Sequence, residues 1–475
     1  MGRVKIWLAV AWIIGLAAAQ AQITNDRTVE LNNDDFEVYT RQADGAWNRI
    51  AVYPVKVDEV KDARHNVRVA SMSTFDFEGK VSVKVVSKRQ PIRETKIQPL
   101  HQAPAGEVRQ DTLFFTLDQP KNLVITINGD IFHNLHLFAN PIDTNRPTAK
   151  QLKRNKGSLL YFAPGVHPLE GDSLRIPSGT TVYVAEGARV VGTLLVDGVR
   201  DVRIFGRGEI HPEGRGEGIY IKRSRHIEVE GVMVTQIPVG ESDSVRITNV
   251  KSISSYGWGD GMNVFASSHV TYDRVFCRNS DDCSTVYATR KGFNGGCRAI
   301  CMKNSTLWAD VAHPIMIGLH GNSEVGDTIQ DVRYENIDIL DHCENQLDYQ
   351  GCFTINGGDN NWVKQVVFDN IRVEDFRKGQ LLNIRIFYNR KYCTAPGAGI
   401  QDVLFKDITY QGDRAELSII SGYNEERKVS NITFDNLVIN GVKIHDEMEG
   451  KPKWYKTSDF ARIFVGEHVE NIIFK

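Results

Sequence analysis

Three aspartates lie close together in the middle of this chain, in the segments 257–261 and 280–283. Asp260 and Asp281 are 21 residues apart, and Asp282 follows directly. Clustered carboxylates repel one another, so one of them tends to hold a proton at neutral pH. A protonated carboxyl beside an ionised one is the acid–base pair that hydrolysis of a glycosidic bond requires. The alternative interpretation is that these aspartates only cap turns or bind calcium.

A histidine follows the aspartates at a related spacing. His313 comes 31 residues after Asp282, which fits one further turn of a repetitive structure with an inserted loop. An imidazole at this position can orient or tune the acid. The alternative is an ordinary core or surface histidine, and His320 nearby is a weaker candidate.

Candidate substrate-binding residues surround the same segments. Sugar rings stack on aromatic faces, which makes Trp258 and Tyr287 candidates, and Asn263, two residues after the first segment, is a further candidate. Arg290 and Lys291 follow the aspartate pair closely and are suited to bind an acidic sugar. A solvated loop is the alternative for these two cations.

The elements that must position these residues repeat along the chain. From about residue 158 a short sequence pattern recurs. It starts with a polar residue, after which apolar residues alternate with other residues. Its copies begin at these residues: Asp201, His226, Ser244, His269, Asp331, Gln365, Asp402 and Asn431. The first four start 25, 18 and 25 residues apart, and the later ones 34, 37 and 29. An apolar spacing of two indicates strands, and a period of roughly 20 to 50 residues indicates a solenoid.

Polar pairs between the strands indicate sharp corners. Many copies continue through a pair such as Asp369-Asn370 into a second strand. Asn and Asp tolerate the left-handed backbone conformation that such corners need. Short strands joined in this way predict a right-handed parallel β-helix, in which residues one coil apart stack at about 4.8 Å. We therefore expect the three aspartates in one patch, which Asp281 and Asp282 reach together only if the backbone bends.

The N-terminal part has a different sequence pattern, without these repeats. Residues 49–53, 81–85 and 123–127 alternate between apolar and polar, which predicts strands with one buried face. Short strands with frequent turns are typical of an antiparallel β-sandwich. The prediction is thus an all-β chain with a sandwich at residues 22–145, a linker at 146–157 and the β-helix at 158–475.

The first 21 residues have the features of a secretory leader. Arg3 and Lys5 precede an apolar run at 6–16, and Ala19-Gln20-Ala21 forms a small-x-small cleavage site. This run is shorter than the roughly 20 residues of a membrane anchor. The expectation is a signal peptide at residues 1–21, a secreted or periplasmic protein and no membrane partner.

Composition narrows the range of partners. The formal net charge of -2 comes from 57 basic and 59 acidic residues, which argues against nucleic acid as a partner. All 7 cysteines lie after residue 276; some pair if the compartment is oxidising, but the sequence does not indicate which. Cys297 and Cys301 lack a matching second pair, so no metal site is predicted. The oligomeric state is not indicated.

Three motifs together carry a resemblance. Residues 258–261, 279–282 and 313–318 resemble the β-helical glycoside hydrolases of the polygalacturonase and dextranase clan, families 28 and 49. Residues 160–166 and 182–188 resemble the entry into the helix in the dextranase and isopullulanase family, whose members also have an N-terminal β-sandwich. The resemblance covers nearly the whole chain after residue 21.

The resemblance also implies roles for single residues. It implies that Asp281 is the general acid and that Asp260 and Asp282 activate water. His313 stands where polygalacturonases have the histidine of a Gly-His-Gly motif, although its neighbours here are Ala312 and Pro314. This departure puts its role in doubt.

Two further positions depart from the polygalacturonase pattern. Trp258 stands where that pattern has an asparagine, two residues before its first aspartate. The basic Arg-Ile-Lys string that grips a galacturonate carboxylate is not evident, and residues 383–386 are the nearest match. Arg385 in that string is interpreted as an ordinary strand residue.

The leading hypothesis is an inverting hydrolase of an α-linked polysaccharide that needs no organic cofactor or metal. A neutral α-glucan, as in the dextranase and isopullulanase family, is the first candidate because of the two-domain layout and the lack of a clear basic grip for an acidic sugar. The alternative is a polygalacturonase-like pectin hydrolase, favoured by the aspartate spacing and by Arg290 and Lys291. A polysaccharide lyase or a non-catalytic carbohydrate-binding solenoid remains a less favoured alternative.

Overall fold

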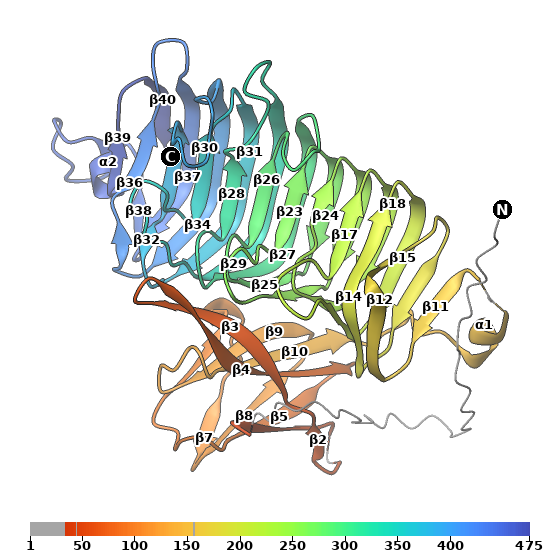
Figure 1. The fold of residues 1–475 in the computed structure, drawn as a ribbon. Coiled ribbons are helices and arrows are strands. Elements are labelled where there is room, and N and C mark those ends of the chain that lie inside the picture. Colours follow the sequence, from red (N-terminus) through yellow and green to blue (C-terminus); the bar gives the residue numbers. More distant parts are fainter. Residues whose placement is uncertain (1–33, 44, 155–156) are drawn as a thin grey trace, which may run out of the picture.

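The computed structural model describes residues 34–43, 45–154 and 157–475, and these residues are almost all in strands and turns. A long solenoid of stacked coils lies against a smaller sandwich (Figure 1). The predicted signal peptide lies outside the described residues. Within the described ranges, no helix combines the length and apolar character needed to cross a bilayer.

The sandwich consists of two five-stranded sheets. The first contains, in spatial order, β2 (Asn48–Ile50), β1 (Phe36–Arg41), β5 (Val81–Ser87), β8 (Thr112–Leu117) and β7 (Glu107–Arg109). The second contains β3 (Tyr53–Lys61), β4 (Arg64–Phe77), β10 (Leu135–Pro141), β9 (Lys121–Ile127) and β6 (Thr95–Gln98), with the 3-10 turn η1 (Leu100–Gln102) after β6. The pairing is antiparallel except between β4 and β10, which run parallel. This sheet is therefore mixed rather than fully antiparallel.

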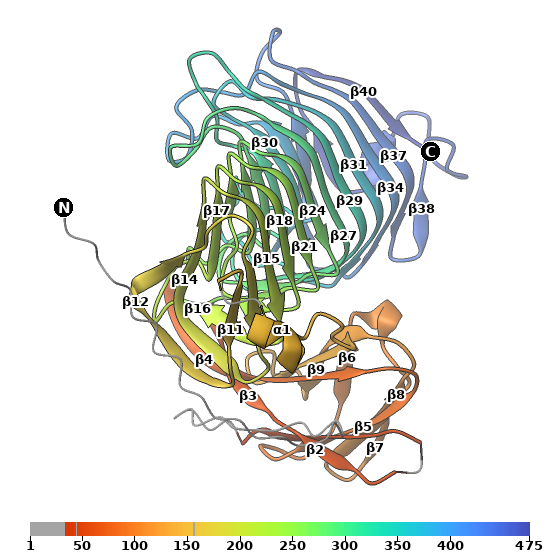
Figure 2. The ribbon, with the colours of Figure 1, turned by 90° about the vertical axis from the view of Figure 1, so that its right-hand side faces the viewer.

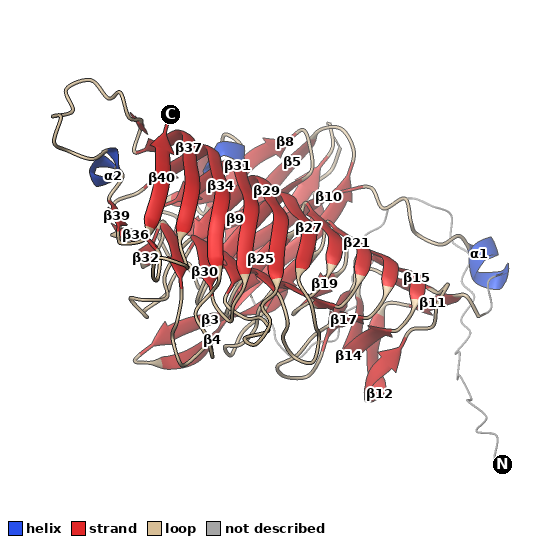
Figure 3. Ribbon diagram, turned by 90° about the horizontal axis from the view of Figure 1, so that it is seen from above, coloured by secondary structure: helices blue, strands red, loops and turns tan. Residues whose placement is uncertain are grey.

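The solenoid is a parallel β-helix, as the repeats predict; its sheet has 28 described strands, of which Val442–Ile444 pairs antiparallel. It begins with β11 (Leu159–Phe162), β12 (Gly165–Arg175), β13 (Thr181–Val184) and β14 (Ala188–Asp197), after the short helix α1 (Ala149–Arg154). Its strands stack in three faces, and the coils follow one another along one axis (Figures 2 and 3).

The first face is open to solvent and contains β15 (Arg200–Gly206), β18 (Arg225–Glu230), β21 (Asp243–Thr248), β24 (Ser268–Asp273) and β40 (Val469–Phe474). The second face contains β16 (Glu209–His211), β19 (Met233–Val234), β22 (Lys251–Ile253) and β25 (Phe276–Asn279). In later coils one bent strand serves both faces: β27 (Cys297–Ala309), β29 (Thr328–Asp341), β31 (Trp362–Glu374), β34 (Gly399–Gln411) and β37 (Val429–Ile439).

The third face contains β17 (Ile219–Lys222), β20 (Val239–Gly240), β23 (Met262–Phe265), β26 (Ser284–Tyr287), β28 (Ile315–Gly318), β30 (Phe353–Gly357), β33 (Leu382–Ile386), β36 (Ser418–Ser421) and β39 (Ile463–Val465). The remaining elements are β32 (Gly379–Gln380), β35 (Ala415–Glu416), β38 (Val442–Ile444) and α2 (Thr457–Phe460). The loops that join the second face to the third form the second–third corner, a name kept below.

The corners adopt the backbone conformation that the polar pairs predict. Asn336 and Asn370 have φ values of 54° and 55°, in the left-handed region, and the first residue of each repeat does the same. One coil was not predicted from the repeats. At its corner the nonpolar Ala299 (φ 56°) occupies the position that His269 and Asp331 hold in the neighbouring coils. The missed coil explains the gap between these two copies.

Stacked side chains fill the interior of the helix. Tyr334, Phe368, Phe405, Phe434 and Phe474 form one ladder, whose adjacent ring centroids are 5.7, 4.8, 4.9 and 4.7 Å apart. Each coil thus buries its apolar residues against equivalents above and below, and burial of each such side chain contributes roughly 1.5–3 kcal/mol. This repetition fixes the register on which the site depends.

The sandwich packs on the second face. Tyr53, Met72 and Phe138 of the sandwich form one buried cluster with Phe276 and Trp308 of the helix. Polar groups cross the same junction: Arg278, fully buried, donates to Asp310 and to Asn134 of the sandwich. Because residues 278 and 310 directly precede the second–third corner, the sandwich supports that corner from behind.

Candidate active site

Register brings the predicted residues together. Met262, Ser284 and Ile315 pair in succession at the start of three neighbouring third-face strands. The residues two positions before them are Asp260, Asp282 and His313. The backbone N–H of Gly261 donates to the carbonyl oxygen of Asp282 at 2.8 Å, which closes the first of these two coil contacts. The three predicted side chains therefore lie side by side at the second–third corner.

The two adjacent aspartates face different surroundings. Strand β25 ends at Asn279 and β26 begins at Ser284, so Asp281 and Asp282 lie in the bend between two faces. Asp281 is half-buried, as is Asp260, whereas Asp282 is buried. The bend that the sequence required is present, and it turns one carboxyl outward and the other inward.

Asp282 is held by three hydrogen bonds. Its Oδ1 accepts from the backbone N of His313 at 3.1 Å and lies 2.7 Å from Nδ1 of the same residue. Its Oδ2 accepts from the hydroxyl of Tyr287 at 2.9 Å. These three contacts fix the Asp282 carboxyl in one orientation.

His313 is the cation of a buried ion pair. Its Nε2 lies 2.7 Å from the carbonyl oxygen of Tyr349, so both ring nitrogens face acceptors and both carry a proton. Burial alone lowers the pKa of His313, but the charge and hydrogen bond of Asp282 outweigh burial and raise it above its usual value. The histidine therefore orients and neutralises Asp282.

The other two carboxyls have raised pKa values. Burial is the main cause that raises the pKa of Asp260 to about 6, and the charge of Asp282 adds to it. Burial also raises the pKa of Asp281 well above its usual range, with further contributions from Asp260 and Asp282. The surroundings thus favour the protonated form of Asp281 over that of an exposed aspartate, while Asp260 has a pKa of about 6, so the two carboxyls differ from ordinary aspartates in the direction that acid–base chemistry needs.

One acidic residue of this cluster was not identified from the sequence. Glu344 is buried, and its charge contributes to the raised pKa of both Asp281 and His313. It lies in the irregular segment between β29 and β30, where no repeat phrase indicates its position. Only the fold brings it to the aspartates.

The sandwich anchors the loop that carries Asp260. The backbone N–H of Gly257 donates to Oδ2 of Asp58 at 2.9 Å, and this oxygen also lies 2.7 Å from Nδ1 of His65. Gly257 has a φ of 73°, and a Cβ there would lie 2.6 Å from Nε2 of His65, so only glycine fits. No sequence pattern links Asp58 to a loop 199 residues away.

The predicted substrate-binding residues fall into two groups. Asn263 and Tyr287 are buried: Asn263 donates to Oδ2 of Asp260 at 2.8 Å, and Tyr287 to Asp282. They position carboxylates rather than lie open to a sugar. Trp258 is 70% exposed.

Arg290 and Lys291 lie near the aspartates. Both counteract the rise in the pKa of Asp260, and neither is buried. The Arg290 guanidinium lies 5.1 Å from the ring centroid of Tyr287, and the Lys291 Nζ lies 5.6 Å from that of Phe265. The two cations therefore border the same third-face surface as the carboxyls.

The two weaker candidates are accounted for by packing. His320 packs edge-on against Tyr287, with ring centroids 5.0 Å apart, and burial with the nearby Arg290 lowers its pKa to about 3. Arg385 is a strand residue, as predicted; its Nε donates to Oδ1 of Asn383 at 2.9 Å, and its guanidinium also contacts the carbonyl of Asp348.

All 7 cysteines are unpaired. In the part of the chain that the structure describes, no three His, Cys, Asp or Glu residues are arranged to hold a metal ion.

Comparison with known proteins places this site in a family. The sequence profile of glycosyl hydrolases family 28 matches residues 215–457, just over half of the chain. The probable endo-xylogalacturonan hydrolase A of Neosartorya fischeri is 24% identical over 274 residues, which cover 51% of this chain and 64% of that protein. The chain thus spans less than two thirds of the curated relative that it matches.

Two solved structures resemble this chain to different degrees. Dex49A from Penicillium minioluteum has a TM-score of 0.53 at 13% identity, over 90% of this chain and 93% of that one. The family 28 exopolygalacturonase of Yersinia enterocolitica has a TM-score of 0.47 at 12% identity, over 84% and 97%. At this identity, the similarity to Dex49A supports the parallel β-helix fold alone.

Proposed function

This chain belongs to glycosyl hydrolases family 28, and from that premise we propose that it hydrolyses the galacturonate-containing backbone of a pectic polysaccharide with inversion. Membership establishes a glycoside hydrolase. The substrate and the stereochemical course are the proposal.

The observation that carries the choice of substrate is the pair of cations beside the acid–base pair. Arg290 and Lys291 act on the pKa of Asp260, and neither has a carboxylate within 4.0 Å among the described residues. A uronate unit offers a carboxylate to such cations, and a neutral glucan does not. The match to a protein named as a xylogalacturonan hydrolase supports the same choice.

The proposed mechanism assigns one task to each carboxyl. Asp281, protonated at neutral pH, donates its proton to the oxygen of the leaving sugar. Asp260, ionised above pH 6, takes a proton from the water that attacks the anomeric carbon. Asp282 already accepts three hydrogen bonds, so its contribution is a fixed charge that adds to burial and to Asp260 in raising the pKa of Asp281.

The neutral α-glucan hypothesis has weaker support. It rests on the two-domain layout, which Dex49A shares as a fold and which says nothing of the sugar. No residue described at the corner favours a neutral sugar over an acidic one.

A substrate screen tests the proposal. Reducing ends released from polygalacturonate, xylogalacturonan, dextran and pullulan are measured with the wild-type protein and with Asp281→Asn as the inactive control. We expect release from a galacturonate-containing polymer and none from the two glucans. Release from dextran or pullulan alone would overturn the choice of substrate, and NMR of the first-formed anomer tests inversion.

We also propose that the protein is exported, since a polymeric substrate lies outside the cell and residues 1–21 have the features of a leader. N-terminal sequencing of protein from the culture medium or periplasm is expected to start at Gln22. An intact Met1 on active protein would contradict this.

A further inference from the structure

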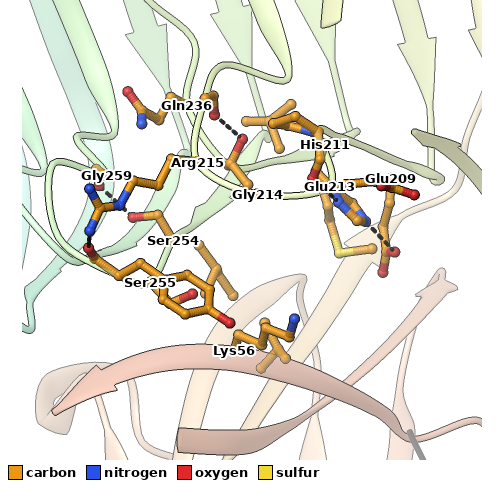
Figure 4. Close-up of a pocket in the computed structure, with 18 of the residues that line it drawn as sticks. Lys56, Glu209, His211, Glu213, Gly214, Arg215, Gln236, Ser254, Ser255 and Gly259 are labelled. Atoms are coloured by element: carbon orange, nitrogen blue, oxygen red, sulfur yellow. Dashed lines mark hydrogen bonds and ion pairs between the residues drawn. The ribbon is translucent and has the colours of Figure 1, made fainter. Parts of the chain in front are cut away.

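A cavity of about 480 Å³ lies where strand β3 of the sandwich crosses the second face of the helix (Figure 4). Its wall includes Ser254, Tyr256 and Gly259, from the loop that ends at Asp260, but none of the three aspartates. Cavities of this size at domain junctions are typical small-molecule sites. The family 28 chemistry described above makes no use of it.

Two cations line this cavity without an acidic partner. Lys56 and Arg215 are exposed, and no carboxylate lies within 4.0 Å of either in the described ranges. The Arg215 guanidinium lies 4.5 Å from the ring centroid of Trp258 and donates to the carbonyl of Tyr256. The Lys56 Nζ lies 5.9 Å from the ring centroid of Tyr256. Cations and aromatic faces are thus presented together.

Arg189 is a third basic residue on the wall. The Nε of Arg189 donates to Nε2 of His211 at 2.8 Å, and Nδ1 of His211 lies 3.1 Å from the carbonyl of Pro212. Burial lowers the pKa of His211, although Glu209, whose Oε2 lies 3.9 Å from Nε2 of this ring, opposes that shift. Glu209 and Glu213 are the acidic residues of the wall.

Lys251 also borders the cavity, but its amine is engaged in contacts within the protein. Its Nζ is fully buried and bonds to Asn140 and to the carbonyl and side chain of Asn249. Burial lowers its pKa well below the usual value. The cations facing the cavity are therefore Lys56, Arg189 and Arg215, against two glutamates.

We propose that this cavity is a second saccharide site, which binds a short uronate-containing chain through Lys56 and Arg215, with a sugar ring on the face of Tyr256. The uronate identity rests on the proposed function. Carboxylates form strong, charge-assisted hydrogen bonds with lysine and arginine, and the amphipathic ring of Tyr256 suits a sugar face. The bound saccharide lies against the loop that positions Asp260.

Binding to an inactive full-length protein tests the site. Trigalacturonate is titrated into Asp281→Asn by calorimetry, while tryptophan fluorescence follows Trp258 beneath Arg215. We expect the double substitution Lys56→Ala and Arg215→Ala to weaken one binding event by roughly tenfold or more and to remove the fluorescence change. The matched control is Lys61→Ala with Arg64→Ala, which removes two exposed cations from the hairpin of β3 and β4 outside the cavity.

The outcomes separate this proposal from the function. If trigalacturonate binds identically to the cavity variant and to its parent, and thermal unfolding shows both folded, the second site does not exist. Maltotriose that competes for the cavity as well as trigalacturonate does would also overturn the uronate assignment. A further outcome is that the wild-type protein fails to hydrolyse polygalacturonate while the double substitution still abolishes binding of trigalacturonate to the cavity. That result would contradict the proposed function and support the second site.

Discussion

Stacking of coils forms Asp–His pairs in different surroundings, and one pair on the first face can be compared with the pair at the second–third corner. Asp243 lies 2.9 Å from His269, with side chains 41% and 56% exposed. Asp282 lies 2.7 Å from His313, with side chains 5% and 0% exposed. The contacts are nearly the same length, yet only the corner pair excludes water.

The neighbouring carboxyls show what this difference does. On the first face, hydrogen bonds from Ser244, Ser268 and His269 lower the pKa of Asp243. At the corner, burial raises the pKa of Asp281 well above its usual range. Coil stacking places an aspartate beside a histidine in both regions, but only at the corner does burial raise the pKa of a neighbouring carboxyl.

The strongest test removes the proton donor from the corner and a matched carboxyl from the first face. We expect Asp281→Asn to lower the rate of reducing-end release by roughly 10²–10⁴-fold, since a positioned acid contributes that much. Asp243→Asn is expected to retain the wild-type rate. A comparable loss of activity in both variants would contradict the proposal that the corner carries the catalytic acid.

The ion pairs themselves are expected to differ in stability. Asp282 would be left as an unpaired buried charge in His313→Ala, at a cost of about 3–5 kcal/mol in unfolding free energy. The exposed pair loses about 0–1 kcal/mol in His269→Ala. Urea unfolding at pH 6 measures both, and equal costs would contradict the comparison.

The corner ion pair also predicts a pH dependence. The pKa of His313 is raised in the folded protein, so its contribution to stability is complete below its ordinary pKa of about 6.5 and is lost as pH rises through the raised value. The difference between wild type and His313→Ala should therefore shrink at alkaline pH.

A smaller effect is expected where the sandwich anchors the catalytic loop. Asp58→Asn weakens the contact to Gly257, so we expect kcat to fall by about tenfold while KM changes little. A loosened loop admits water to Asp260 and lowers its pKa, so the acidic limb of the kcat–pH profile should move down. The exposed Asp62→Asn on the same hairpin is the control. A fall in stability with an unchanged pH profile would reduce Asp58 to a purely structural role.

The smallest expected effect concerns the cations beside Asp260. Activity is expected to rise with pH through about 6, as Asp260 loses its proton. The double substitution Arg290→Ala and Lys291→Ala removes two charges that lower the pKa of Asp260. The acidic limb of the activity–pH profile should therefore shift to higher pH by less than about one unit. Arg298→Ala, exposed on the first face, should leave the limb in place.

The repeats predicted the solenoid and most of its coils, because alternation and αL corners are local properties. The coil of β27 was missed since Ala299 carries no polar marker at its corner. The aspartate cluster was predicted because a spacing of 21 residues is close to one coil. Asn263 and Tyr287 were correctly placed near it, but their burial beneath the carboxylates has no sequence signal.

By itself the sequence determined which residues share a corner, since coil length and strand register follow from local patterns. Only the tertiary structure decided what each residue does there. It buried Asp282 against His313, brought Glu344 from an irregular loop and Asp58 from another sheet, and left Asp281 half-buried. The pKa of a carboxyl depends on its exposure to solvent and on charges that are distant in the chain. The residues next to it in the sequence predict neither.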